Sequence, residues 1–196
     1  MSAAILAGGR ASRFGGIDKA ALLIGGERII DRQLAAVSAV ASEIFIIGNE
    51  PQRFAGLGIP VIPDVVAGAG PIGGIATALQ AAGHDWVLVL ACDLPFVTAA
   101  LLERLAAARD ENVDLVLPRS VRGVEPLCAV YARSILPLVR QRIDDEERQL
   151  AALAALLRVR EIGPDALAEL DRDGRLFENV NTPHDYGRAI GAVKKA

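Results

Sequence analysis

Short apolar runs alternate with longer amphipathic runs along the chain. The short runs are β-branched or end at glycine, which is typical of strands. They lie at residues 3–6, 43–47, 59–62, 86–92, 113–117 and 127–131. The longer runs place apolar residues near helical spacing and predict helices at 28–40, 75–82, 98–109 and 146–157. This alternation predicts an α/β fold with a mostly parallel sheet that is covered by helices on both faces.

Polar residues mark where several of these helices begin. Thr98 stands at the N-cap position of one predicted helix. Thr182, Pro183 and Asp185 occupy the N-cap, N1 and N3 positions of a last helix. The acidic run at residues 144–147 is interpreted as a favourable start for the helix at 146–157.

The length and composition indicate one globular domain, residues 1–196. The chain is 52% hydrophobic and 23% charged, which excludes intrinsic disorder. No apolar run approaches the roughly 20 residues of a membrane helix, and the first ten residues lack a signal peptide's basic region, so we expect a cytoplasmic protein without a membrane partner. Cys92 and Cys128 lie in apolar stretches, which favours two buried thiols over a disulfide.

The charges argue against a nucleic-acid partner. The net charge is −3, and the only basic run is Lys194-Lys195. Lys19 is the only lysine in residues 1–193, because all other cations there are arginines. A compact point charge at that position is typical of a phosphate site, although an arginine-biased sequence can also produce this count by chance.

A glycine-rich segment follows the first predicted strand. Residues 6–19 read LAGGRASRFGGIDK, with four glycines and the cations Arg10, Arg13 and Lys19. Glycines allow backbone N–H groups to approach phosphate oxygens, and Arg13 and Lys19 can neutralise a triphosphate. The segment matches neither a Walker A loop nor G-x-G-x-x-G. We therefore predict a phosphate site of another kind, the alternative being an ordinary turn with solvated arginines.

Residues 68–73 do match G-x-G-x-x-G, but Pro71 interrupts the motif and Pro63 and Asp64 separate it from the preceding strand. A dinucleotide fingerprint links a strand directly to a helix. We therefore interpret the segment as a loop, either shaped for backbone contact with a ligand or a simple turn.

Polar residues also follow two predicted strands and precede the last helix. Ligands of such sheets bind outside the carboxyl ends of the strands, so the loops after residues 6, 47, 62 and 92 are expected to line one crevice. Asp93 ends the most apolar strand, where a carboxylate suits Mg²⁺, and Asp64 is a weaker candidate. Asn179 and Asn181 alternate along an extended segment and are expected to face the same side; turn and capping chemistry is the alternative.

These motifs together resemble the molybdenum cofactor guanylyltransferases. The resemblance runs nearly end to end and rests on LAGG with RFGG-x-DK, then GPIGG, WVLVLACDLP, EPLCAVY and FENVNTPHD. It implies a three-layer α/β/α sandwich, Rossmann-like, with one antiparallel strand near the sheet edge. It also implies transfer of GMP from GTP to the terminal phosphate of molybdopterin, with Mg²⁺ as cofactor. Cofactor-assembly proteins and recipient molybdoenzymes are the protein partners it implies.

The resemblance assigns roles to residues. The catalytic set is Lys19, Arg13 and Asp93, with Asp93 as the metal ligand. The nucleotide set is Leu6, Ala7, Gly8, Gly9, Lys19, Asn49, Asp64 and Asp93, and the pterin set is Arg148, Asn179 and Asn181.

Two departures weaken these assignments. Ile47 stands where the family often has asparagine, and residues 145–149 replace a G-E-R-R-like turn. The alternatives are a cytidylyltransferase or another nucleotidyltransferase, a non-catalytic nucleotide-binding partner module, and a Rossmann oxidoreductase. The Gly8-Gly9 pair favours the guanylyl enzyme, because the cytidylyl relatives tend to read LAAG.

Overall fold

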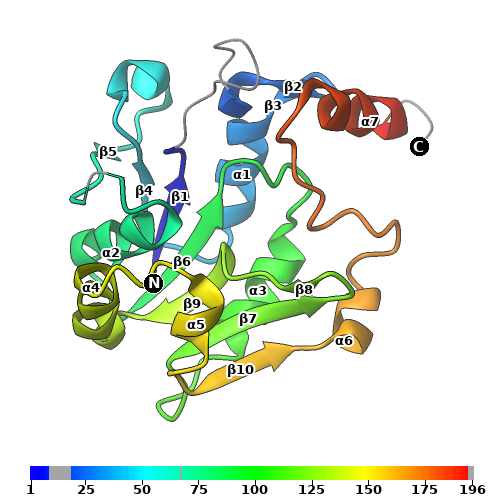
Figure 1. The fold of residues 1–196 in the computed structure, drawn as a ribbon. Helices are drawn as coiled ribbons and strands as arrows, with labels where there is room; N and C mark the ends of the chain where they lie inside the picture. Colours follow the sequence, from blue (N-terminus) through cyan, green and yellow to red (C-terminus); the bar gives the residue numbers. More distant parts are fainter. Residues whose placement is uncertain (9–18, 67, 194–196) are drawn as a thin grey trace.

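The structure is a computed structural model that describes residues 1–8, 19–66 and 68–193. Within these residues, eight strands form one sheet whose main path has the order β10-β7-β9-β6-β1-β4-β5, with β8 paired to β7 off this path (Figure 1). The strands are β1 (Ser2–Leu6), β4 (Glu43–Ile47), β5 (Val61–Ile62), β6 (Trp86–Ala91), β7 (Leu115–Ser120), β8 (Gly123–Val124), β9 (Cys128–Ala132) and β10 (Val159–Ile162). A separate two-stranded sheet pairs β2 (Leu23–Ile24) with β3 (Glu27–Arg28).

The directions of the strands agree with the expected fold class. β1 pairs in parallel with both β4 and β6, and β5 and β10 also pair in parallel with their neighbours. β9 is antiparallel to β6 and to β7, so it is the one reversed strand on the main path. The short β8 is a second reversed strand outside that path.

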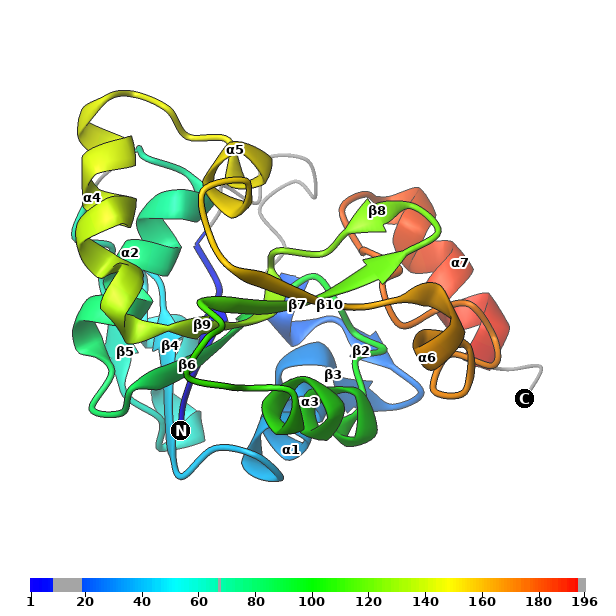
Figure 2. The ribbon, with the colours of Figure 1, turned by 90° about the horizontal axis from the view of Figure 1, so that it is seen from below.

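Helices cover both faces of this sheet (Figure 2). Successive residues of a strand point to opposite faces, so Ala3 and Ile5 of β1 belong to one apolar core and Ala4 and Leu6 to the other. The first core contains α1 (Ile29–Ser38), α3 (Ala99–Ala107) and α6 (Pro164–Ala168); the second contains α2 (Pro71–Ala81), α4 (Leu136–Asp144) and α5 (Leu150–Ala154). The three-layer prediction is confirmed.

The last helix, α7 (Pro183–Val193), does not cover the sheet. It packs on the β2–β3 hairpin in a small third core that includes Leu22, Ile24, Val180 and Ala189. The hydroxyl of Tyr186 on α7 donates to the carbonyl of Leu23 at 2.9 Å. These contacts bring the segment before α7 close to η2 (Lys19–Ala21), which also follows β1.

Two helix predictions are wrong in position. The helix predicted at 146–157 is only α5, because Glu146 adopts a left-handed φ of 59° and Glu147 turns back to pair with Arg142. The acidic run therefore lies at the end of α4 and in the following turn, not at a helix start. The helix predicted at 75–82 begins earlier, at Pro71, since proline suits the first helical position.

None of the helices in the described part of the chain is long and apolar enough to cross a membrane.

Candidate active site

A cavity of about 520 Å³ opens at the carboxyl ends of the parallel strands. It is lined from the ends of β1, β4 and β6, from the segment after β5, and from Lys19 and Asn181. The sequence prediction that these loops line one crevice is therefore confirmed.

The end of β1 is held in the centre of the sheet. The N–H of Ala7 donates to the carbonyl of Ile47 at 2.9 Å, and the N–H of Cys92 donates to the carbonyl of Leu6 at 3.1 Å. Leu6, Ala7 and Gly8 all line the cavity. Gly9 and Arg13, predicted for the same phosphate site, lie outside the described residues.

Asp64 lies against the backbone of Gly8. A Cβ at Gly8 would stand 3.1 Å from Oδ2 of Asp64, so this close approach favours glycine. Asn49 holds the aspartate with two hydrogen bonds: its Nδ2 donates to Oδ2 of Asp64 at 3.3 Å, and its Oδ1 accepts from the Asp64 N–H at 3.0 Å. Burial raises the pKa of Asp64, and the bond from Asn49 partly opposes that rise. Asn49 is exposed and does not itself line the cavity; its contact with the cavity residues is through Asp64.

Lys19 meets Asn181 at the mouth of the cavity. Nζ of Lys19 donates to Oδ1 of Asn181 at 2.6 Å. Asn181 precedes α7, where a reciprocal cap fixes the backbone: Thr182 Oγ1 accepts from the Asp185 N–H, and Oδ2 of Asp185 accepts from the N–H groups of Asn181 and Thr182. Thr182 and Asp185, which predicted the start of this helix, therefore also fix the backbone of Asn181 at the cavity.

Asp93 interacts with Lys19 and Asn181 in the same cavity. It follows β6, is partly buried, and lines the cavity. Burial raises its pKa, while the charge of Lys19 and a hydrogen bond with the Asn181 side chain partly oppose that rise. Its carbonyl accepts from the N–H of Val180 at 2.9 Å. One lysine, one carboxylate and one amide thus converge from three distant segments of the chain.

The amino end of α2 faces the cavity. Gly70, at the N-cap, has a φ of 70°, and Gly70, Pro71 and Gly74 line the cavity. A Cβ at Gly74 would stand 3.2 Å from Cδ1 of Leu6, so glycine allows α2 to pack on β1. The interpretation of residues 68–73 as a loop is wrong in its second half, since Gly73 is helical. The positive end of the α2 dipole points at this side of the cavity.

Of the three residues predicted to lie toward the pterin, only Asn181 lines the cavity. Arg148 is exposed, and its Nη1 donates to the carbonyl of Gly68, a cavity residue, at 2.7 Å. Asn181 lines the cavity, whereas Asn179 is exposed and does not. Val180, which lies between the two asparagines, is buried, and the expectation that both asparagines face the same side stays a prediction.

The two cysteines are thiols. Cys128 is buried, and burial raises its pKa, while Cys92 is partly buried and lines the cavity.

The motif analysis overlooked Arg53. It lies in η3 (Pro51–Leu57) after β4 and lines the cavity, with its guanidinium over the ring of Phe54 at 5.5 Å. The only signal in the sequence is a cation six residues beyond a strand end, and a short 3₁₀ segment has no periodicity that would have placed it.

Comparison with known proteins now decides between the alternatives. Residues 3–161 match the family model described as the MobA-like NTP transferase domain. The chain belongs to this family. It is therefore a nucleotidyltransferase, as the motifs implied, and Leu6, Ala7 and Gly8 at the start of the glycine-rich segment line the cavity.

Individual relatives of the chain are consistent with this family assignment. The chain is 34% identical over 190 residues to a molybdenum cofactor guanylyltransferase of Desulfosudis oleivorans, covering 97% of this chain and 94% of the relative. The crystal structure of molybdopterin-guanine dinucleotide biosynthesis protein A from Archaeoglobus fulgidus is 27% identical, with a TM-score of 0.83 and full coverage of both chains. A Mycobacterium tuberculosis protein solved as a complex with manganese shares the fold at 15% identity, with a TM-score of 0.65 and coverage of 97% and 98%.

Proposed function

We propose that this protein transfers GMP from GTP to the terminal phosphate of molybdopterin, forming the guanine dinucleotide cofactor and releasing pyrophosphate. The convergence of Lys19, Asp93 and Asn181 beside Gly8 carries the proposal. The match to the MobA-like family and the names of the relatives favour guanylyl transfer over the cytidylyl and non-catalytic alternatives.

The reaction needs positioning and charge neutralisation more than proton transfer. A phosphate oxygen of molybdopterin attacks the α-phosphorus of GTP, a new P–O bond forms, and the bond from the α-phosphorus to the bridging oxygen breaks in line as pyrophosphate leaves. The attacking phosphate monoester is already an anion, so no strong general base is required. Lys19 supplies positive charge to the phosphates, and Arg13 is proposed to do the same.

The donors at the site suit a hard divalent cation. Asp93 offers a carboxylate, a ligand type that Mg²⁺ prefers, while the amide oxygen of Asn181 accepts from Nζ of Lys19. Within the described residues, no three His, Cys, Asp or Glu side chains gather into a metal site, so substrate phosphates and water would complete the shell. We propose Mg²⁺ as the cofactor; when bound, it would withdraw charge from the phosphate oxygens. Asp93 would hold it and Lys19 would balance the remaining charge.

The nucleoside would lie between the end of β1 and Asp64. Backbone groups of Leu6, Ala7, Gly8 and Gly9 would contact base, ribose and phosphates, and Asp64, fixed by Asn49, would contact the nucleoside. Since Ile47 lines the cavity with an apolar side chain, base recognition would rest on backbone groups at that point. Arg148, Asn179 and Asn181 would lie toward the pterin.

We further propose that residues 1–196 act as one cytoplasmic domain that receives molybdopterin from assembly proteins and delivers its product to molybdoenzymes. The central test is a transfer assay with molybdopterin and each of GTP, CTP, ATP and UTP in Mg²⁺. Formation of the dinucleotide from GTP alone supports the proposal. A preference for CTP would keep the reaction class and overturn the guanylyl assignment. Nucleotide binding without any transfer would favour the partner-module alternative.

A further inference from the structure

Helix α1 sends one buried polar side chain to the turn that carries Asp93. Gln33 is 1% exposed. Its Nε2 donates to the carbonyl of Ala91 at 2.8 Å and to the carbonyl of Leu94 at 3.1 Å. These two carbonyls stand on either side of Cys92 and Asp93 in the chain. A single amide therefore spans the turn in which the carboxylate is placed.

The buried amide of Gln33 has one polar atom that lowers the stability of the fold. Oε1 of Gln33 is buried and has no hydrogen-bond partner among the described residues. An unsatisfied buried acceptor destabilises the folded protein, because it has lost its hydrogen bonds with water. Rotating the amide would place this oxygen against two carbonyl oxygens, so the orientation is fixed by repulsion as well as by the bonds. A methionine or leucine would fill this core position without the orphan acceptor. The gain from glutamine is therefore in the two bonds to the turn.

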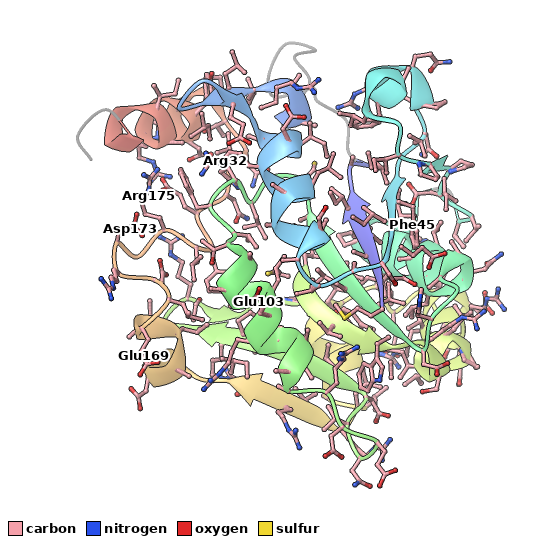
Figure 3. The ribbon with its side chains drawn as sticks, turned by 180° about the vertical axis from the view of Figure 1, so that it is seen from behind. Arg32, Phe45, Glu103, Glu169, Asp173 and Arg175 are labelled. Atoms are coloured by element: carbon pink, nitrogen blue, oxygen red, sulfur yellow. The ribbon has the colours of Figure 1, made fainter. Side chains whose placement is uncertain are left out.

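Other groups hold the same turn from outside. Nε of Arg32, also on α1, donates to the carbonyl of Pro95 at 3.1 Å, and the guanidinium of Arg175 stacks on the ring of Phe96 at 3.7 Å. Figure 3 labels Arg32 on α1 and Arg175 in the segment between α6 and α7. These contacts fix residues beyond Asp93. Gln33 differs because its acceptors bracket Asp93.

We propose that Gln33 is a positioning residue for Asp93. By fixing the carbonyls of Ala91 and Leu94, it sets the direction in which the turn presents the carboxylate to Lys19 and Asn181. The inference rests on the proposed function to the extent that Asp93 binds a divalent cation together with the nucleotide.

Binding of Mn²⁺ tests the inference without catalysis. The dissociation constant of Mn²⁺ would be measured by electron paramagnetic resonance, with full-length protein saturated by a GTP analogue that cannot be transferred. Gln33→Met keeps the volume and removes both bonds, and it is expected to weaken Mn²⁺ binding about ten-fold. Val37→Ala is the matched control: Val37 is buried one turn further along α1, so this variant lowers stability without touching the turn. Its Mn²⁺ affinity is expected to stay within two-fold of the wild type.

A second variant covers the case in which Gln33→Met does not fold. Gln33→Glu keeps the length, and burial favours its protonated form, which can donate one hydrogen bond. It is expected to bind Mn²⁺ with an affinity between those of the wild type and Gln33→Met.

The possible failures are distinct. If the wild type binds Mn²⁺ and both Gln33 variants match it, or if Val37→Ala weakens binding equally, the positioning role is overturned. If the wild type itself binds no Mn²⁺ with the analogue, the proposed metal site fails, and the inference fails with it.

Discussion

Nζ of Lys19 lies 2.6 Å from Oδ1 of Asn181, so a residue that follows the first strand is bonded to one that follows the last. Replacing Lys19 by alanine removes a positive charge that acts on Asp93 and releases Asn181. We expect the transfer rate to fall on the order of 10²-fold or more, as for loss of one preorganised stabiliser. Pyrophosphate release measures the rate, and circular dichroism and thermal unfolding check the fold. Turnover close to the wild type would exclude a role for Lys19 at the phosphates.

The burial of Asp93 costs stability when its carboxylate is ionised. Burial raises its folded-state pKa above the ordinary aspartate value of 3.8, so the folded protein binds a proton more strongly than the unfolded chain does. The contribution of Asp93 to stability therefore falls as pH rises between these two pKa values, and its ionised form destabilises the ligand-free protein at neutral pH. Asp93→Asn is expected to raise the melting temperature at pH 7 and to lower the rate on the order of 10²-fold or more. A lower melting temperature, or an unchanged rate, would contradict this.

Asn49 supports Asp64 from an exposed position. Asn49→Ala removes both hydrogen bonds to Asp64 and is expected to raise KM for GTP about five- to ten-fold, with kcat within two-fold. Asn112→Ala is the control, because Asn112 makes a similar pair with Asp110 in a turn outside the cavity. Equal effects from the two variants would argue against a nucleotide-binding role for Asp64.

A variant of Arg148 tests which of the two substrates this side chain contacts. If it lies toward the pterin, Arg148→Ala raises KM for molybdopterin about ten-fold and leaves KM for GTP within two-fold. Arg140→Ala removes a comparable exposed arginine of α4, which bonds Gln80, and is expected to change neither constant. A rise in KM for GTP alone would show that Arg148 acts through its bond to Gly68, on the nucleotide side.

Glu43 links stability to pH at the other end of the sheet. Its pKa is lowered first by the hydroxyl of Ser2, then by the N–H of Gly83 and by His84. A lowered folded-state pKa gives stability above the unfolded value, near 4.5, and this stability is lost as pH falls through the folded value. Glu43→Gln should therefore melt below the wild type at pH 7, with the difference shrinking below pH 4.5. A difference that does not vary with pH would point to packing instead.

The sequence predicted the sheet better than the site. The strands at 3–6, 43–47, 59–62, 86–92, 113–117 and 127–131 carry enough apolar residues to be found by pattern, whereas β10, with two charged residues out of four, and the two-residue β8 were missed. Residues at the carboxyl ends of the predicted strands, including Asp64 and Asp93, followed from topology. The contact of Lys19 with Asn181 could not be predicted, because it depends on how α7 docks on β2 and β3. The helix predicted at 146–157 failed because a left-handed residue, Glu146, interrupts a pattern that is otherwise helical. Asn179 is exposed and does not line the cavity, which alternation along the chain alone could not show.

The place of Asn181 in the chain has a consequence for biosynthesis. A ribosome delivers the chain from its N-terminal end, so all strands of the sheet, with Gly8, Asp64 and Asp93, emerge before Asn181 does. The sheet can therefore fold while the segment that carries Asn181 is still being made. At that stage the cavity lacks Asn181, so the proposed site is complete only after α7 packs onto the β2–β3 hairpin.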